Sequence, residues 1–159
     1  MTEAPTIRPA RRADLPAVAQ LAGKLVRMHH GYDAPRFFLP DRIEEGYAWW
    51  FGREIDREEV VLLVAARGDA VVGYAYGRLE ERDWNQLLDA CGALHDILVD
   101  ESARGRGLGE ALLKEVLTRM AKKGQPRVLL HTAVQNESAQ RLFKKHGFRT
   151  TMLEMTCEL

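Results

Sequence analysis

The segment Arg104-Gly105-Arg106-Gly107-Leu108-Gly109 decides the fold, because it joins a strand-like run to an amphipathic helix. Residues 93–99 are mostly apolar and are predicted to form a strand. Residues 108–123 repeat apolar side chains every fourth position, which predicts a helix. Glycines permit positive φ and carry no side chain, so several N–H groups can converge just ahead of that helix. Such a loop is typical of a phosphate-binding site.

The spacing of the glycines excludes two common nucleotide motifs. A dinucleotide fingerprint requires glycine three residues after Gly107, where this chain has Glu110. A P-loop requires Lys followed by Ser or Thr after its last glycine, where this chain has Glu110 and Ala111. A glycine-rich turn that binds nothing is the competing interpretation of the loop.

Working outward from the loop, the pattern predicts an α/β chain with alternating strands and helices. Asp14 is expected to cap the first helix, and Gly68-Asp69 has the composition of a two-residue hairpin turn. No linker or repeat interrupts the chain, so we expect one domain over residues 1–159. In chain order the expected elements are a strand at 6–8, helices at 14–30 and 41–52, strands at 60–67, 70–80 and 93–99, a helix at 108–123, a strand at 127–134, a helix at 136–146 and a strand at 148–158.

Composition excludes several protein classes. The chain has 159 residues, of which 46% are hydrophobic and 29% charged, as in ordinary globular domains. Its longest apolar run, residues 60–66, is too short to cross a membrane. Cys91 and Cys157 form no ligand-spaced pair and suit a reducing cytoplasm. The formal net charge is zero, which argues against a general nucleic-acid binder, although residues 104–159 are basic and could face an anion.

Two motifs together carry a family resemblance. Leu98-Val99-Asp100 through Arg104-x-x-Gly107-x-Gly109 resembles the coenzyme A loop of the GNAT superfamily of N-acetyltransferases. A second segment, Asn136-x-x-Ala139-x-x-Leu142-Phe143-x-x-x-Gly147-Phe148, is similar to another motif of that family, and the start of the chain also resembles it. The resemblance implies an α/β (α+β) GNAT fold: a mixed central sheet of about six to seven strands, four helices on both faces, and central parallel strands that splay apart.

The resemblance also implies acetyl-CoA as co-substrate and no metal. The pyrophosphate is expected on the amides of residues 104–110, and the pantetheine arm along the strand at 97–99, where it enters the gap between the splayed strands. The cofactor-binding residues implied in this way are Ile97, Leu98, Val99, Arg104, Gly105, Arg106, Gly107, Leu108, Gly109, Glu110, Asn136 and Phe143.

Two polar residues inside the apolar strand, His95 and Asp96, are the candidate bases for removing a proton from an amine. Histidine has the better intrinsic pKa near neutrality, and Asp96 could instead orient the amine. Neighbouring strand residues face opposite sides, so both can face one site only if a bulge rotates one of them. The alternative is that either residue is structural. A backbone N–H of Leu98 or Val99 is expected to stabilise the oxyanion.

One position departs from the family pattern. Many GNAT enzymes have a tyrosine that meets the leaving thiolate, where this chain has Phe143, which cannot donate a proton. The departure leaves two hypotheses open. One is an N-acetyltransferase that acts by direct attack in a ternary complex on a primary amine, either a polyamine-like small molecule or a peptide N-terminus or lysine. The other is a non-catalytic acyl-CoA sensor or interaction module.

The acceptor site is expected where acidic and aromatic side chains gather, since such a set suits a cationic amine. The substrate-binding candidates are Tyr32, Asp33, Glu81 and Trp84. Because dimers are common in this family, the resemblance also implies a possible homodimer.

Overall fold

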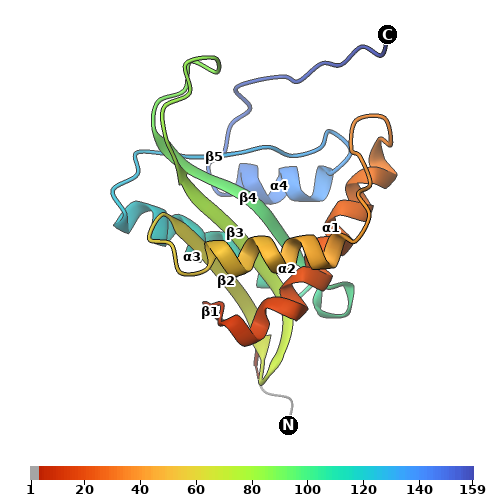
Figure 1. Cartoon of the computed structure of the whole chain (residues 1–159). Helices are drawn as coiled ribbons and strands as arrows, with labels where there is room; N and C mark the ends of the chain where they lie inside the picture. Colours follow the sequence, from red (N-terminus) through yellow and green to blue (C-terminus); the bar gives the residue numbers. More distant parts are fainter. Residues whose placement is uncertain (1–3) are drawn as a thin grey trace.

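Five strands form one sheet in the order β1-β2-β3-β4-β5 in the computed structural model, which describes residues 4–159 (Figure 1). The first four strands are antiparallel neighbours, and β5 lies parallel to β4. The strands are β1 (Thr6–Pro9), β2 (Val60–Arg67), β3 (Ala70–Glu80), β4 (Cys91–Val99) and β5 (Val128–Leu130), and the helices are α1 (Leu15–Tyr32), α2 (Ile43–Glu54), α3 (Leu108–Lys122) and α4 (Glu137–Lys145).

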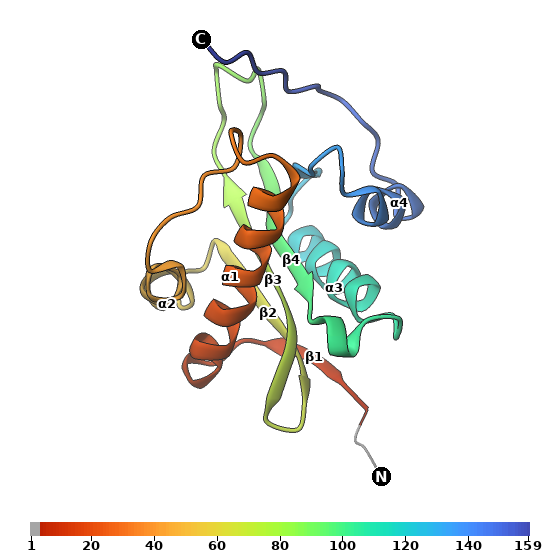
Figure 2. The ribbon, with the colours of Figure 1, turned by 90° about the vertical axis from the view of Figure 1, so that its right-hand side faces the viewer.

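The helices cover both faces of the sheet, as the family resemblance implies. Figure 2 shows α1 and α2 on one side and α3 and α4 on the other. Alternation along the strands builds a separate apolar layer on each face: Val64 and Tyr74 pack with α1 and α2, whereas Leu63 and Ala75 pack with α3. Two core layers over one mixed sheet confirm the α/β class.

Local signals in the sequence predicted most of the elements well. Gly68 has a φ of 57°, which places it in the turn between β2 and β3, so the hairpin is confirmed. Asp14 lies at the N-cap position of α1 but makes no side-chain capping bond there. Its carboxylate instead accepts hydrogen bonds from the Arg11 N–H (2.7 Å) and the Arg8 guanidinium (2.7 and 3.0 Å), which ties β1 to α1.

The parallel pair β4–β5 separates after only three residues. Gly92, Ala93 and Leu94 pair with Val128, Leu129 and Leu130, and the rest of β4 has no register partner on β5. The expected strand over 127–134 is therefore shorter than predicted. The splaying of the two strands is confirmed, and it exposes one backbone edge of β4 beyond Leu94.

The last strand expected over 148–158 is wrong. Phe148 packs against Phe143 at a ring distance of 5.7 Å, but residues 149–159 form no strand and are exposed. The apparent alternation of this segment is not matched by any partner strand, and the sheet has five strands rather than six or seven. None of the helices within residues 4–159 has both the length and the apolar character of a bilayer-spanning helix.

Candidate functional site

A β-bulge in β4 brings His95 and Asp96 to the same face of the sheet. Tyr76 on β3 pairs with Asp96, but the next residue, Gly77, pairs with Leu94, so His95 is an extra residue in the ladder. Strict alternation would put Leu94 and Leu98 in the same core layer, yet they belong to opposite layers. The bulge reverses the alternation and places both candidate bases beside one pocket.

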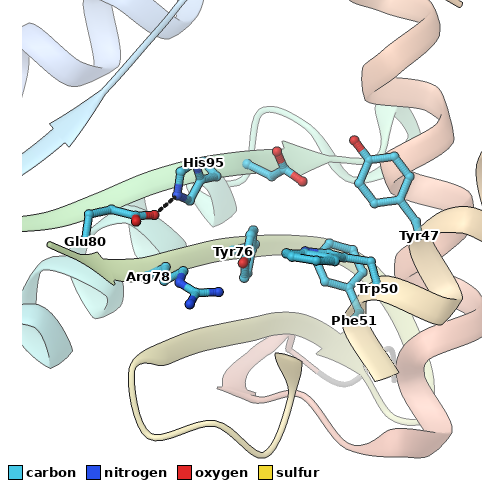
Figure 3. Close-up of a pocket in the computed structure, with 8 residues that line it drawn as sticks. Tyr47, Trp50, Phe51, Tyr76, Arg78, Glu80 and His95 are labelled. Carbon is cyan, nitrogen blue, oxygen red and sulfur yellow. Dashed lines mark hydrogen bonds and ion pairs between the residues drawn. The ribbon is translucent and has the colours of Figure 1, made fainter. Parts of the chain in front are cut away.

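His95 is held by two neighbours. Its Nε2 lies 2.7 Å from Oε1 of Glu80, and its ring stacks on Tyr76 with centroids 5.5 Å apart (Figure 3). A carboxylate that accepts the Nε2 proton leaves Nδ1 as the basic atom of a neutral imidazole. The same carboxylate stabilises the imidazolium after proton uptake, which suits a general base.

Asp96 is a desolvated carboxyl with one hydrogen-bond donor nearby. Burial raises its pKa, although the Tyr74 hydroxyl, which donates to Oδ2 over 3.0 Å, opposes the shift. Burial and the charge of Asp96 in turn hold the pKa of Tyr74 well above its usual value. Burial and Asp96 also raise the pKa of Tyr47, on α2, to about 12. The two phenols that interact with Asp96, Tyr74 and Tyr47, therefore stay protonated at neutral pH.

A buried ion-pair network forms the floor beside these residues. Glu54, which is fully buried at the end of α2, accepts hydrogen bonds from Tyr76 (2.8 Å), Arg78 (2.7 Å) and Arg57 (3.2 Å). Desolvation raises the pKa of Glu54, but these partners outweigh it and hold the pKa below its usual value. The network fixes the positions of Tyr76 and Arg78.

The pocket between α2 and the β3–β4 pair has a volume of about 360 Å³. This is within the size range of small-molecule sites. Figure 3 shows the aromatic side chains of α2 facing the two strands. The lining residues are Tyr47, Trp50, Phe51, Tyr76, Arg78, Glu80, His95 and Asp96.

The substrate-binding residues expected from the sequence lie outside this pocket, and their role in binding stays a prediction. None of Tyr32, Asp33, Glu81 and Trp84 lines the pocket. Trp84 is 75% exposed in the turn that follows β3, and Tyr32 and Asp33 lie where α1 ends. Tyr47 and Trp50 of α2 are not among the substrate-binding residues expected from the sequence, and the packing of α2 on β3 brings them to the pocket.

The glycine-rich loop has the backbone geometry expected of an anion site. Gly105 and Gly107 have φ of 75° and 73°, and a Cβ built at either position meets nothing within 4 Å. The first helical hydrogen bond of α3 runs from Ala111 N–H to Gly107 O, so three N–H groups precede it. Those N–H groups belong to Leu108, Gly109 and Glu110. Arg104 and Arg106 are exposed beside them.

The side chain of Glu110 turns away from the loop toward α4. Its carboxylate binds Lys145 (3.0 Å), His146 (3.0 Å) and Lys114 (3.2 Å). Hydrogen bonds from Lys145 and Lys114 lower the pKa of Glu110 to about 2. Glu110 thereby links the N-terminus of α3 to the C-terminus of α4.

Two residues of the second motif have structural roles. The side chain of Asn136 caps α4 by accepting a hydrogen bond from Ala139 N–H (3.2 Å), which leaves its amide NH₂ available. Phe143 is buried in the α3-side core layer, where its ring packs on Phe148.

The exposed edge of β4 presents alternate backbone groups to the gap. Gly92 N–H donates toward β5 (to Arg127 O, 3.0 Å), whereas Asp100 N–H donates toward β3 (to Val72 O, 2.8 Å). The N–H groups of successive strand residues point alternately to the two sides of the strand, and the bulge interrupts this alternation once. Leu98 N–H therefore points toward β3, and Val99 N–H points into the gap. Arg104 Nε donates to Val99 O over 3.1 Å, in agreement with this direction. The geometry therefore favours Val99 over Leu98 as an oxyanion donor.

Comparisons with known proteins agree with this geometry. The model of the Acetyltransferase (GNAT) family matches residues 25–148. An uncharacterised N-acetyltransferase of Methanocaldococcus jannaschii is 27% identical over 149 residues, which are 90% of this chain and 60% of that protein. A mycothiol acetyltransferase of Beutenbergia cavernae is 32% identical over 108 residues, which are 67% of this chain and 32% of that protein. The chain thus spans 60% or less of the length of these relatives.

A solved structure supports the fold independently. An aminoglycoside N-acetyltransferase in complex with CoA has a TM-score of 0.79 and 17% sequence identity, and the match covers 100% of this chain and 97% of that one. At this identity the likeness concerns the fold.

Proposed function

Because this chain belongs to the acetyltransferase (GNAT) family, we propose that it transfers the acetyl group of acetyl-CoA to a primary amine. The acceptor is a small-molecule amine, polyamine-like amines included, or a peptide N-terminus or lysine, and it attacks the thioester directly while both substrates are bound. The observation that carries this proposal is the β4 bulge, which brings a carboxylate-bound histidine and a desolvated carboxyl to one pocket.

The loop at 104–110 fits the diphosphate of coenzyme A. Two glycines with positive φ and no neighbours at the Cβ position leave room for phosphate oxygens to approach the backbone. Three N–H groups ahead of the first helical bond of α3 supply donors, and the helix dipole favours a negative charge there. Arg104 and Arg106 add positive charge at the same place.

The exposed edge of β4 fits the amide-bearing arm of the same molecule. Residues 97–99 have no register partner on β5, so their outward backbone groups can bind an extended chain as another strand would, except the Val99 carbonyl, which accepts a hydrogen bond from Arg104 Nε. From His95 to Val99 the strand spans about 13 Å, which separates the amine pocket from the phosphate loop. Bound acetyl-CoA supplies an activated thioester carbonyl at the pocket end of this edge.

The chain's own groups then carry the transfer. His95, with Glu80 on its Nε2, takes the proton of the amine on Nδ1 and so generates the neutral nucleophile. Val99 N–H points into the gap but lies at the phosphate-loop end of the edge. By the same alternation Ile97 N–H also points into the gap, and because it lies nearer the pocket we assign to it the stabilisation of the negative charge that develops on the carbonyl oxygen. Asp96 orients the incoming ammonium before it is deprotonated. The tetrahedral intermediate collapses by breaking the C–S bond, and coenzyme A leaves as a thiolate that takes a proton from solvent, because Phe143 has no proton to offer and is buried in the α3-side core layer.

Release of free thiol tests the proposal directly. Purified protein is mixed with acetyl-CoA and a panel of primary amines, and coenzyme A thiol is measured together with the acetylated amine. The proposal predicts stoichiometric thiol and amide with at least one amine. Tight acetyl-CoA binding with no amide from any amine would instead support the non-catalytic sensor.

His95→Gln separates the base from a structural role. Glutamine can still donate to Glu80 but cannot take up a proton at this position. The variant should lose turnover while its affinity for coenzyme A and its thermal midpoint stay unchanged. A fall in turnover that is accompanied by weaker coenzyme A binding and a lower thermal midpoint would show that His95 has a structural role.

A further inference from the structure

The only lysine or arginine among the residues that line the pocket is already neutralised. Arg78 donates to Glu54 over 2.7 Å and lies 3.5 Å from Glu59. Arg57, which does not line the pocket, pairs with the same two carboxylates at 3.2 and 2.9 Å. Two cations therefore face two anions, and this network leaves no surplus positive charge for a ligand.

The two carboxyl groups that line the pocket favour a positively charged ligand. Glu80 and Asp96 are carboxyl groups, and His95 between them is bound to Glu80. An ammonium group gains from both carboxylates. A phosphate or carboxylate on the acceptor would meet two like charges and no free guanidinium, and a charged group left unpaired in a partly buried site costs binding free energy.

The walls of the pocket are aromatic. Tyr47 and Trp50 project from α2 toward Tyr76 and His95 on the strands (Figure 3). Trp50 remains 39% exposed, so its ring is available to a ligand, whereas Phe51 is fully buried. Aromatic faces bind flat apolar groups and attract ammonium ions. The carboxyl groups of Glu80 and Asp96 thus favour a positive charge, and the aromatic walls favour a ring.

We propose that the acceptor is a primary amine attached to an aromatic or other apolar ring and carrying no phosphate or carboxylate. The inference rests on the proposed acetyl transfer and narrows its acceptors to amines that carry a ring, which leaves out linear polyamines. The amine nitrogen lies beside His95 and Asp96, and the ring packs against Trp50.

Matched pairs of amines test the charge requirement. Phenethylamine and phenylalanine differ by one carboxylate, and tyramine and tyramine O-phosphate by one phosphate. We expect kcat/KM to fall by about 100-fold with either anionic group, the factor expected for one unpaired charged group. An anionic member that is acetylated as well as its neutral partner, or better, would overturn the inference.

A neighbouring tryptophan provides the control for the ring requirement. Trp49 is 63% exposed on the same helix and does not line the pocket. Trp50→Ala should lower kcat/KM for phenethylamine by about tenfold, as expected for losing one ring-stacking partner, and change that for butylamine, which has no ring, by less than about twofold. Trp49→Ala should change neither. Equal effects of the two variants would contradict the assignment.

Binding measurements separate this inference from the proposed reaction. If no amine of the panel yields thiol, the acetyl transfer fails, but calorimetry of the same amines with the protein–CoA complex still reads the pocket. We then expect phenethylamine to bind and phenylalanine to bind at least about 100-fold more weakly. Equal affinities, or the reverse order, would reject the proposed acceptor class.

Discussion

Replacing Gly107 by alanine tests the phosphate loop, because its backbone strain can be matched elsewhere. Gly107 has a φ of 73°, and Gly124, beyond the C-terminus of α3, has a φ of 76°; a Cβ at either position meets nothing within 4 Å. An L-residue in this region costs about 1–2 kcal/mol. Gly107→Ala and Gly124→Ala should therefore lose similar free energies of unfolding in urea.

Only Gly107→Ala should lose affinity for coenzyme A. The new methyl group at Gly107 stands beside the N–H groups that precede the first hydrogen bond of α3. Loss of one charge-assisted hydrogen bond to phosphate costs about 2 kcal/mol, which is about 30-fold in Kd. Calorimetry of coenzyme A binding should show that factor for Gly107→Ala and a change below about twofold for Gly124→Ala. Equal dissociation constants for the two variants would refute the placement of the diphosphate.

Three further variants test the pocket and its supports. His95→Gln should lower kcat by about 100-fold or more without weakening coenzyme A binding, measured by thiol release and calorimetry; unchanged kcat would remove His95 as the base. Since the pKa of Asp96 is raised in the folded protein, the native state binds more protons than the unfolded state just above pH 3.8, and stability falls as pH rises. Asp96→Asn, which still accepts from Tyr74, should thus be more stable in urea at pH 7 and lose that advantage below pH 3.8, whereas a less stable variant at pH 7 would contradict the cause given for the shift. The pKa of Glu110 is lowered to about 2, so its contribution is present above pH 4.5 and lost as pH falls toward about 2; Glu110→Gln should flatten the acid part of the urea stability curve, and a parallel curve would disprove the pairing with Lys145.

Local sequence signals predicted most of the fold because local chemistry determines those parts. The turn at Gly68, the helix α3 and the loop that precedes it are set by residues close together in the chain. The segment 148–158 alternates like a strand, but alternation alone does not form one. A strand needs a partner edge, and the partner is a property of the whole sheet.

The pocket could be predicted only in part. His95 and Asp96 stood out as polar residues in an apolar strand, but the bulge that turns both to one face depends on the register between β3 and β4. Trp50 and Arg78 reach the pocket because α2 packs on β3, a contact between segments that are distant in sequence. Acidic and aromatic composition pointed to Glu81 and Trp84, whereas the neighbouring Glu80 lies at the site because it faces His95.

A crystal structure of the protein with bound coenzyme A tests the central claim most directly. We predict phosphate oxygens within hydrogen-bond distance of the N–H groups of residues 108–110, and the pantetheine amides paired with the outward backbone groups of Val99 and its neighbours on β4. The thiol should end beside His95 and Asp96. The account would be contradicted by coenzyme A that binds away from the loop. It would also be contradicted by coenzyme A that makes no contact with the β4 edge beyond Leu94.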